Sequence, residues 1–435
     1  MSDSVLRVGF GEADITPKVG ALMVGSLTPR ASIGVADPLL AKALVAESGG
    51  RKVAILGGDI VDIARGLADP AIAEASRRTG IPREAITLSG SHTHSGTYAL
   101  DWFIPGAADP AYVASLPGLM ADAIERANAA LQPATMSIGR SLVHHGLHHR
   151  RVTLKNGLAL NTWMRGALDD IDLCPQVLGS AGPIDPELWV VRFDDLKGQM
   201  IGVFFNLSLH VNSRFGDRFS ADYPGVVAEA MRREFGPRVT TVFAPGACGN
   251  VNPTLGGEAH WRELAEFNAE AAVAAAKRAK RVEGPVVVDA ARRDVLVPRR
   301  DPESQPAGAV ERLNWGGGMA YAELFDGWRS KVGQMPEQLS IPVNAVRLGP
   351  LGIATNAGEL FVEWGLEIKQ RSPFPHTVVA ELTNDSIGYQ PSRSAFEQQA
   401  YETLVGPNRV SLEGIQKLVD TAVELLEELW AGRRD

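Results

Sequence analysis

The chain has 435 residues, of which 45% are hydrophobic and 22% are charged, as in ordinary globular proteins, so a disordered or fibrous protein is excluded. The net charge is -8 and no basic block is present, which argues against a nucleic-acid partner. The only cysteines, Cys174 and Cys248, exclude a disulfide framework and a four-cysteine zinc site.

The N-terminal segment, MSDSVLRVGFGEADITP, lacks the basic start and the apolar core of a secretory signal. No run reaches the roughly 18 apolar residues that cross a bilayer. We therefore expect a cytoplasmic protein that does not insert into membranes and has a small-molecule substrate. A homo-oligomer stays possible.

Apolar runs rich in β-branched residues predict strands, and amphipathic segments that follow several of them predict helices. This order favours an α/β fold with mixed sheets and flanking helices, in which a metal site lies at strand ends. Since no linker or repeat is evident, we expect a single domain over residues 1–435. The predicted strands are 52–56, 85–89, 200–206, 239–243, 351–355 and 377–382, and the predicted helices are 70–79, 117–131, 224–235, 260–280, 359–371 and 411–430.

Two regions are less regular. Residues 140–200 have the character of strands and turns. Residues 298–345 are rich in glycine, proline and charge, and we expect an insertion that is either a surface excursion or a loop over a site.

Histidines mark the first candidate site. His92 and His94 form an H-x-H pair directly after the 85–89 strand, and on an extended segment alternate side chains point to the same side. Small neighbours such as Ser91 and Gly96 leave room for a metal or a substrate. The pair by itself fits a metal site and a hydrogen-bonded pair without metal about equally well.

Three further candidates lie at predicted strand ends or in the loops beyond them, where α/β proteins gather ligands. His210 ends the apolar run VFFNLSLH, Glu359 stands where a strand joins a helix, and Tyr389 follows the 377–382 strand. Taken one at a time, each also fits a structural role: a core histidine, a carboxylate that offsets a helix dipole, and a core tyrosine.

Other chemistry-bearing residues have weaker support. The histidine cluster at 144–149 has no nearby cysteine or carboxylate, so a structural or substrate-contact role fits better than a metal role. Cys248 has no evident neighbour that would activate it as a nucleophile. Asp59 fits equally an orienting partner of a ligand histidine and a cap. No phosphate-loop, dinucleotide-binding or G-x-S-x-G motif is present.

The order of several segments resembles the N-terminal catalytic part of the neutral/alkaline (non-lysosomal) ceramidase family, from about residue 7 to residue 405. The most specific pieces are Ala13–Pro17 (ADITP), Thr93–Gly96 (THSG), Gly358–Glu359 and Ser386–Tyr389 (SIGY). The resemblance implies an amidase with one Zn²⁺ per chain. It implies His92, His210, Glu359 and Tyr389 as the metal ligands, His94 near the scissile carbonyl, and Arg150 in contact with substrate.

The sequence departs from the family at two points. Asn252 stands where the family has a serine implicated in catalysis, and an amide side chain cannot act as a nucleophile or pass a proton as a hydroxyl does. We also expect no C-terminal immunoglobulin-like domain. Both points favour a small soluble substrate over ceramide.

The expected function is therefore hydrolysis of a non-peptide amide by zinc-activated water, with His94, Asn252 and Arg150 as catalytic residues. Trp102 and Phe103, close after the H-x-H pair, are the expected substrate-binding aromatics. One alternative is a zinc-dependent esterase or lactonase. The other is a carbohydrate- or lipid-headgroup-binding protein with a degenerate catalytic site.

Overall fold

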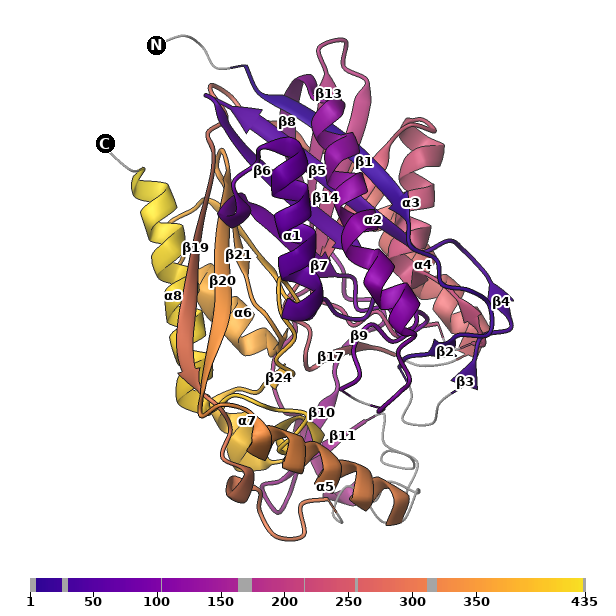
Figure 1. The fold of residues 1–435 in the computed structure, drawn as a ribbon, viewed down its shortest axis with the longest axis vertical. Coiled ribbons are helices and arrows are strands. Elements are labelled where there is room, and N and C mark those ends of the chain that lie inside the picture. Colours follow the sequence, from indigo (N-terminus) through magenta and orange to yellow (C-terminus); the bar gives the residue numbers. More distant parts are fainter. Residues whose placement is uncertain are drawn as a thin grey trace.

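A nine-stranded mixed sheet forms the larger half of the protein, with the order β16-β14-β13-β8-β1-β5-β6-β7 and with β18 beside β8 (Figure 1). The computed structural model describes residues 5–25, 30–102, 104–162, 174–214, 216–254, 257–310 and 319–432. The strands of this sheet are β1 (Arg7–Asp14), β5 (Leu40–Ser48), β6 (Arg51–Gly58), β7 (Ile86–Gly90), β8 (Gln132–Leu142), β13 (Glu187–Asp195), β14 (Met200–Leu207), β16 (Thr240–Pro245) and β18 (Lys280–Arg281).

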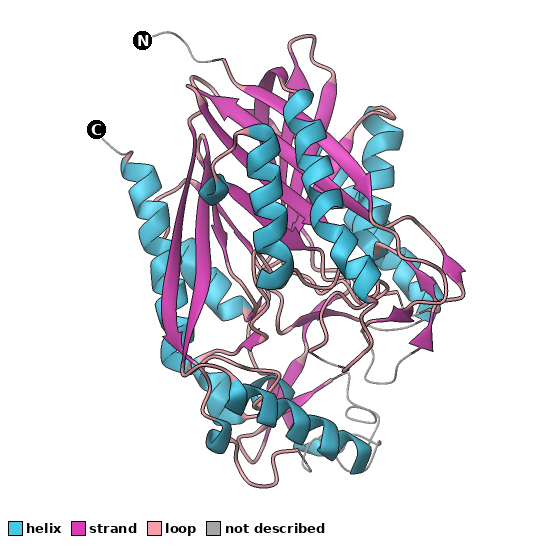
Figure 2. Cartoon of the chain, in the orientation of Figure 1, coloured by secondary structure: helices cyan, strands magenta, loops and turns pink. Residues whose placement is uncertain are grey.

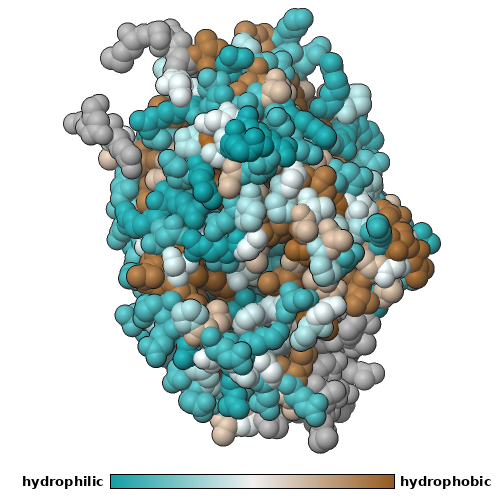
Figure 3. All heavy atoms as spheres, in the orientation of Figure 1, coloured by the Kyte–Doolittle hydropathy of each residue, from teal (hydrophilic) through white to brown (hydrophobic). Residues whose placement is uncertain are grey.

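Two helix pairs cover this sheet (Figure 2). Helices α1 (Arg65–Thr79) and α2 (Pro110–Ala129) pack together, with α2 against β1 and β5, and α3 (Asp222–Phe235) packs on α4 (Gly257–Lys277), which covers β8 and β13. The apolar sides of these helices face the sheet, and the face seen in Figure 3 is mostly hydrophilic with scattered apolar patches.

A second sheet has the order β19-β20-β21-β23 and is covered by helix α8 (Leu412–Ala431), which packs on β19, β20 and β21. One hydrophobic cluster contains residues from both sheets, among them Val45 of β5 and Ile353 of β21. The strands are β19 (Val288–Pro298), β20 (Gln338–Leu348), β21 (Leu351–Thr355) and β23 (His376–Ala380), and the adjoining helices are α5 (Met319–Gln334), α6 (Val362–Arg371) and α7 (Arg393–Gln398).

Short strand pairs lie beyond the ends of the large sheets. Strand β9 (Leu147–His149) pairs with β17 (Val251–Pro253), and β22 (Glu359–Leu360) pairs in parallel with β24 (Tyr389–Gln390). The remaining short strands are β2 (Leu22–Met23), β3 (Arg30–Ala31), β4 (Gly34–Val35), β10 (Arg151–Leu154), β11 (Ala159–Asn161), β12 (Val177–Ser180) and β15 (Arg218–Phe219).

Parallel strand pairs decide where the site lies. β6 pairs in parallel with β7, β14 with β16, and β21 with β23, so the carboxyl ends within each pair lie together. The large sheet curls until β16 contacts β6 and β7 at its other end. Gly57 permits this approach, because a Cβ there would lie 2.0 Å from the carbonyl oxygen of Phe243. The three pairs therefore deliver their following loops to one region.

The expected α/β class with mixed sheets and flanking helices is confirmed, and every predicted strand and helix has a counterpart at nearly the predicted place. Helices α1 and α2 begin earlier than predicted, at Arg65 and Pro110 rather than at 70 and 117. Helix α6 begins later than predicted, at Val362, because Glu359–Leu360 forms β22. Residues 140–200 are rich in strands, as predicted. The 298–345 region contains α5 and most of β20, two elements that the sequence did not predict. None of the described helices has the length and apolarity to cross a membrane.

Candidate metal centre

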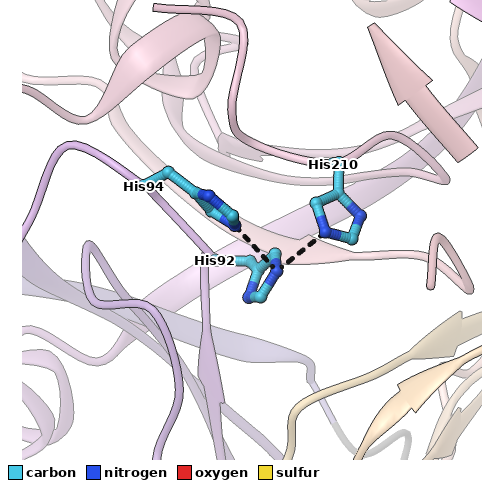
Figure 4. Close-up of side chains that lie close together, drawn as sticks. All are labelled: His92, His94 and His210. Carbon is cyan, nitrogen blue, oxygen red and sulfur yellow. Dashed lines mark hydrogen bonds between the residues drawn. The ribbon is translucent and has the colours of Figure 1, made fainter. Parts of the chain in front are cut away.

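Three imidazoles meet beyond the strand ends (Figure 4). His92 follows β7 and His210 follows β14, and their Nε2 atoms lie 3.0 Å apart. The Nε2 atom of His94 lies 3.2 Å from that of His92. Nitrogen atoms of all three residues lie within 4.8 Å of one another, so the group can hold a metal ion.

Glu359 adds a carboxylate to this group. Its Oε2 atom lies 3.3 Å from His92 Nε2 and 3.5 Å from His210 Nε2, and it has no hydrogen-bond partner among the described residues. Two ligand atoms held about 2.0–2.1 Å from one zinc ion at a tetrahedral angle lie roughly 3.3 Å apart. The three separations within the His92–His210–Glu359 set match this value, so these residues fit the metal that the resemblance implies.

Backbone carbonyls fix which ring nitrogens face the centre. Nδ1 of His92 lies 2.9 Å from the carbonyl oxygen of Val61, and Nδ1 of His210 lies 2.7 Å from that of Cys248. A carbonyl can only accept, so both Nδ1 atoms carry the proton and both Nε2 atoms of the neutral rings present a lone pair. Lone pairs 3.0 Å apart repel each other unless a cation lies between them.

Electrostatics also favour a cation here. Burial and the neighbouring His92 lower the pKa of His210 to about 4, so this ring is neutral near pH 7. Although burial opposes it, the neighbouring side chains of His92 and His210 hold the pKa of Glu359 well below its usual range, so the carboxylate is ionised. The site thus presents an ionised carboxylate and neutral imidazole nitrogen, the donor set that zinc binds in proteins.

The H-x-H segment is not extended, contrary to the sequence expectation. His92 has φ of 68°, in the left-handed region, which non-glycine residues seldom adopt. Its backbone N–H donates to Ile60 (3.0 Å) and that of His94 donates to Val211 (2.9 Å). The loops after β6 and β14 therefore hold the bend, and the two imidazoles converge through tertiary contacts rather than through strand alternation.

Tyr389 lies directly beside Glu359, because the two residues are paired in the β22–β24 register. Its ring lies under the guanidinium of Arg150, with Arg150 Cζ 5.0 Å from the ring centroid. Burial raises the pKa of the Tyr389 hydroxyl well above the ordinary value, although a hydrogen bond with Arg150 acts in the opposite direction. Its position agrees with the predicted ligand set, and direct ligation by Tyr389 stays a prediction.

Arg150 and Asn252 meet at the same centre. Arg150 Nη1 lies 3.3 Å from His210 Nε2 and donates to Asn252 Oδ1 at 3.2 Å. Its Nε donates to Glu402 Oε1 at 2.7 Å, and the Arg150 and Asn252 residues are both 2% exposed. The backbone N–H of Arg150 donates to Asn250, next to β17, which brings both side chains to the histidines.

The structure describes one of the two aromatic residues that we expected to contact the substrate. Trp102 is partly buried and stacks on Arg409, whose Cζ lies 3.8 Å from the ring centroid. Phe103 lies outside the described residues.

The orienting role considered for Asp59 is wrong, because its Oδ2 accepts from the Leu40 N–H and from Lys42 Nζ at 3.1 Å. The carbonyls of Val61 and Cys248 orient His92 and His210 instead.

Sequence reasoning missed several buried ionisable residues around the centre, among them Glu402, Arg409 and Glu381. Glu402 pairs with Arg150. Glu381 Oε2 accepts from the backbone N–H groups of Cys248 (3.1 Å) and Leu360 (2.8 Å), and Cys248 Sγ donates to its Oε1 at 2.9 Å. Burial raises the pKa of the Cys248 thiol well above its ordinary value, so the thiol is protonated and is a poor nucleophile. No local motif marks these residues, since their partners lie far away in sequence.

Comparison with known proteins supports the resemblance. No protein-family model matches the chain. A neutral ceramidase from Pseudomonas aeruginosa is 25% identical over 272 residues, which cover 58% of this chain and 38% of the relative. The match thus spans less than two thirds of that relative's length.

Solved structures agree with it at the level of fold. A crystal structure of neutral ceramidase from Pseudomonas aeruginosa has a TM-score of 0.74 at 20% identity, covering 98% of this chain and 75% of that chain. A structure described as ceramidase complexed with C2 has a TM-score of 0.76 at 19% identity, covering 99% of this chain and 76% of that chain. The expected similarity to neutral ceramidases is thereby confirmed in sequence and in fold.

Proposed function

We propose that this chain is a zinc-dependent hydrolase that cleaves a non-peptide amide bond of a small or amphiphilic substrate. The observation that carries the proposal is the convergence of His92, His210 and Glu359 at ligand-to-ligand distances, with both Nδ1 atoms bound to carbonyls. The matched relative is named for ceramide, which is itself an amide.

His92, His210 and Glu359 would hold the ion, with Tyr389 as the fourth ligand. A zinc ion held there would act as a Lewis acid and would lower the pKa of a bound water towards about 7. The remaining residues bind the substrate and move its protons.

His94 is the residue placed for proton transfer. Burial lowers the pKa of His94 well below its ordinary value, and the neighbouring His92 and His210 lower it further. The ring is therefore neutral near pH 7, and its Nε2 faces the same centre at 3.2 Å from His92 Nε2. As a neutral base it would take the proton that the attacking water loses and then pass that proton to the leaving nitrogen.

Arg150 is the residue placed to bind a developing negative charge. A guanidinium stays charged at any working pH, and its donors are fixed by Glu402 and Asn252. Asn252 contributes through Oδ1, which accepts from Arg150 Nη1. In this proposal Asn252 positions Arg150, a role that needs no hydroxyl.

The test combines metal analysis with a paired substrate panel. Purified protein should contain about one zinc per chain, and His92→Ala and Glu359→Gln should lose both the metal and the activity. His145→Ala is the matched control, because His145 is partly exposed and lies beside Glu263 rather than at the centre. His94→Ala should keep the metal and lose activity by about 10²–10⁴-fold.

Matched substrates separate the alternatives. N-lauroylethanolamine is the amide and ethylene glycol monolaurate is the corresponding ester. Faster chelator-sensitive turnover of the ester would favour the esterase alternative. Absence of zinc in the wild type, or full turnover by Glu359→Gln, would contradict the proposal. Metal binding without turnover of either compound would favour the non-enzymatic binding protein. Loss of metal in His94→Ala would make His94 a ligand.

A further inference from the structure

Arg409 is a buried arginine that the proposed chemistry does not use. The residue is 3% exposed, and its guanidinium stacks on the indole of Trp102 at 3.8 Å from Cζ to the ring centroid. Stacking on an aromatic face fixes the plane of a guanidinium and leaves its edge free for hydrogen bonds. The orientation of this side chain is therefore set before any ligand binds.

The donors of Arg409 are only partly used. Its Nε donates to the carbonyl of Gly406 at 3.3 Å and its Nη1 donates to that of Ser386 at 2.8 Å. Its Nη2 is buried and has no hydrogen-bond partner among the residues that the structure describes. Both acceptors are neutral carbonyls, so neither balances the charge.

No carboxylate in the described part of the chain forms an ion pair with Arg409. Burial lowers the pKa of Arg409 to about 10, while the carboxylates of Asp62, Glu359 and Asp385 raise it through space without a hydrogen bond. The group is still charged near pH 7. A buried charge with no carboxylate in direct contact is costly, and protein interiors nearly always pair one directly.

A second unused donor lies beside the first. The indole Nε1 of Trp102 is buried and has no hydrogen-bond partner among the described residues. The Trp102 loop is held by α5, because Lys331 Nζ donates to the backbone carbonyls of Asp101 (3.2 Å) and Trp102 (2.9 Å). Through this contact, helix α5 of the 298–345 region supports the loop that carries Trp102.

Arg409 is carried by a segment that borders the candidate metal centre. The segment 406–409 runs beside Tyr389, whose N–H donates to the carbonyl of Pro407 at 2.9 Å. Asn408 Nδ2 donates to the carbonyl of Tyr389 at 2.9 Å. Glu359, the carboxylate at the centre, is among the acidic groups that act on Arg409.

We propose that Arg409 and Trp102 form a carboxylate-binding subsite beside the metal centre, so that the preferred substrate is an amide that also carries a free carboxylate. The part of this inference that concerns substrate preference rests on the proposed amidase function. A carboxylate suits the subsite because its two oxygens can accept from the guanidinium edge and from the indole N–H, and because its charge balances the buried cation.

The first experiment compares N-lauroylglycine with N-lauroylethanolamine, which differ only in carboxylate against hydroxymethyl. The wild type should prefer the glycine compound by about tenfold or more in kcat/KM, the effect of one charge-assisted hydrogen bond. Arg409→Gln should bring the ratio close to one. Arg347→Gln is the matched control, since Arg347 also stacks on an indole, that of Trp430, on the α8 side of the protein. A structural role of Arg409 would lower both rates together and leave the ratio unchanged.

The second experiment tests binding without turnover. 2-(Dodecyloxy)acetate and 2-(dodecyloxy)ethanol contain neither an amide carbonyl nor a basic nitrogen and differ in carboxylate against hydroxymethyl, so calorimetry on the metal-loaded protein reports binding without turnover. Tighter binding of the carboxylate compound that Arg409→Gln abolishes would support the subsite even if neither amide is hydrolysed, in which case only the proposed function fails. Equal binding of both compounds to the wild type would overturn the inference. If Arg409→Gln does not fold, Trp102→Phe keeps an aromatic ring and removes the donor, and it should reduce the same preference; an unchanged preference would overturn the inference.

Discussion

Arg150 and Glu402 form an ion pair buried inside the protein, with Nε 2.7 Å from Oε1, and the side chains of the pair are 3% and 0% exposed. Glu402 lies in the 3-10 turn Tyr401–Thr403, while Arg150 follows β9. The pair therefore determines where the guanidinium meets His210 Nε2. Glu402 Oε2 also lies 3.7 Å from Arg151 Nε.

Removing this carboxylate should destabilise the fold. Glu402→Ala leaves two buried guanidinium groups without their counter-ion, and we expect the free energy of unfolding to fall by about 3–5 kcal/mol. Glu402→Gln keeps an acceptor and should cost less. Urea denaturation measures both. A change within about 0.5 kcal/mol for Glu402→Ala, the size of an ordinary surface substitution, would show that the pair is not a main contributor.

The same pair predicts a pH dependence. Although burial opposes it, the charges of Arg150 and Arg151 lower the pKa of Glu402. A lowered folded-state pKa stabilises the fold fully above the unfolded-state value of about 4.3, and the contribution is lost as the pH falls through the folded-state pKa. The stability difference between wild type and Glu402→Gln should therefore be constant near neutral pH and shrink below about pH 4. A difference that grows on acidification would contradict this assignment.

Metal removal should lower stability as well as activity. A ligand that binds only the folded state at about 100 times its Kd stabilises that state by about 2.7 kcal/mol. Dialysis against a chelator should therefore lower the melting temperature, and added zinc should restore it. Glu359→Gln is the control, since this variant should melt at one temperature with or without chelator. Equal melting of wild type in both conditions would speak against a bound metal.

Gly25 lies against the back of His94. An alanine Cβ at Gly25 would lie 2.5 Å from His94 Cβ, and φ at Gly25 is 93°. Gly25→Ala should therefore displace His94 and lower kcat by about 10²-fold, as expected for a misplaced catalytic group. Gly20 is the matched control, because its φ is 98° but a Cβ added there would meet nothing within 4 Å. Gly20→Ala should carry the backbone strain alone; equal losses of kcat would assign the effect to strain.

Glu381 ties two ligand-bearing segments together. It binds the N–H of Cys248, whose carbonyl holds His210, and the N–H of Leu360, which follows Glu359. Glu381→Ala should weaken zinc binding by about 10–100-fold, as removal of supporting hydrogen bonds does at other metal sites. Competition with a chromogenic chelator measures this. Cys248→Ala removes only the thiol donor and should bind zinc nearly as tightly as wild type. A loss of zinc affinity of the same size in both variants would show that the structure around the centre has loosened as a whole.

The sequence contained enough information to predict the α/β class, the parallel-paired strands β6, β7, β14, β16, β21 and β23, and six of the helices. These elements have local causes: β-branched apolar runs, amphipathic spacing and terminal signals act within a few residues. Strands β1, β5, β8 and β19 were not predicted, and neither were the elements of the 298–345 region. Helix α5 and strand β20 lie among glycine, proline and charged residues, and their contacts with the Trp102 loop and with β19 come from elsewhere in the chain.

The sequence also determined which residue types were available for chemistry, and His92, His210 and Glu359 could be named from motif order and resemblance. Only the tertiary structure decided that they share one centre, since curling of the large sheet brings the ends of β7 and β14 together. The tertiary structure also decided that the backbone of His92 is in the left-handed region, that Asp59 binds Lys42, and that Arg150 is held by an ion pair with Glu402. A buried charge needs a partner in space, and pairing in space leaves no local pattern along the chain.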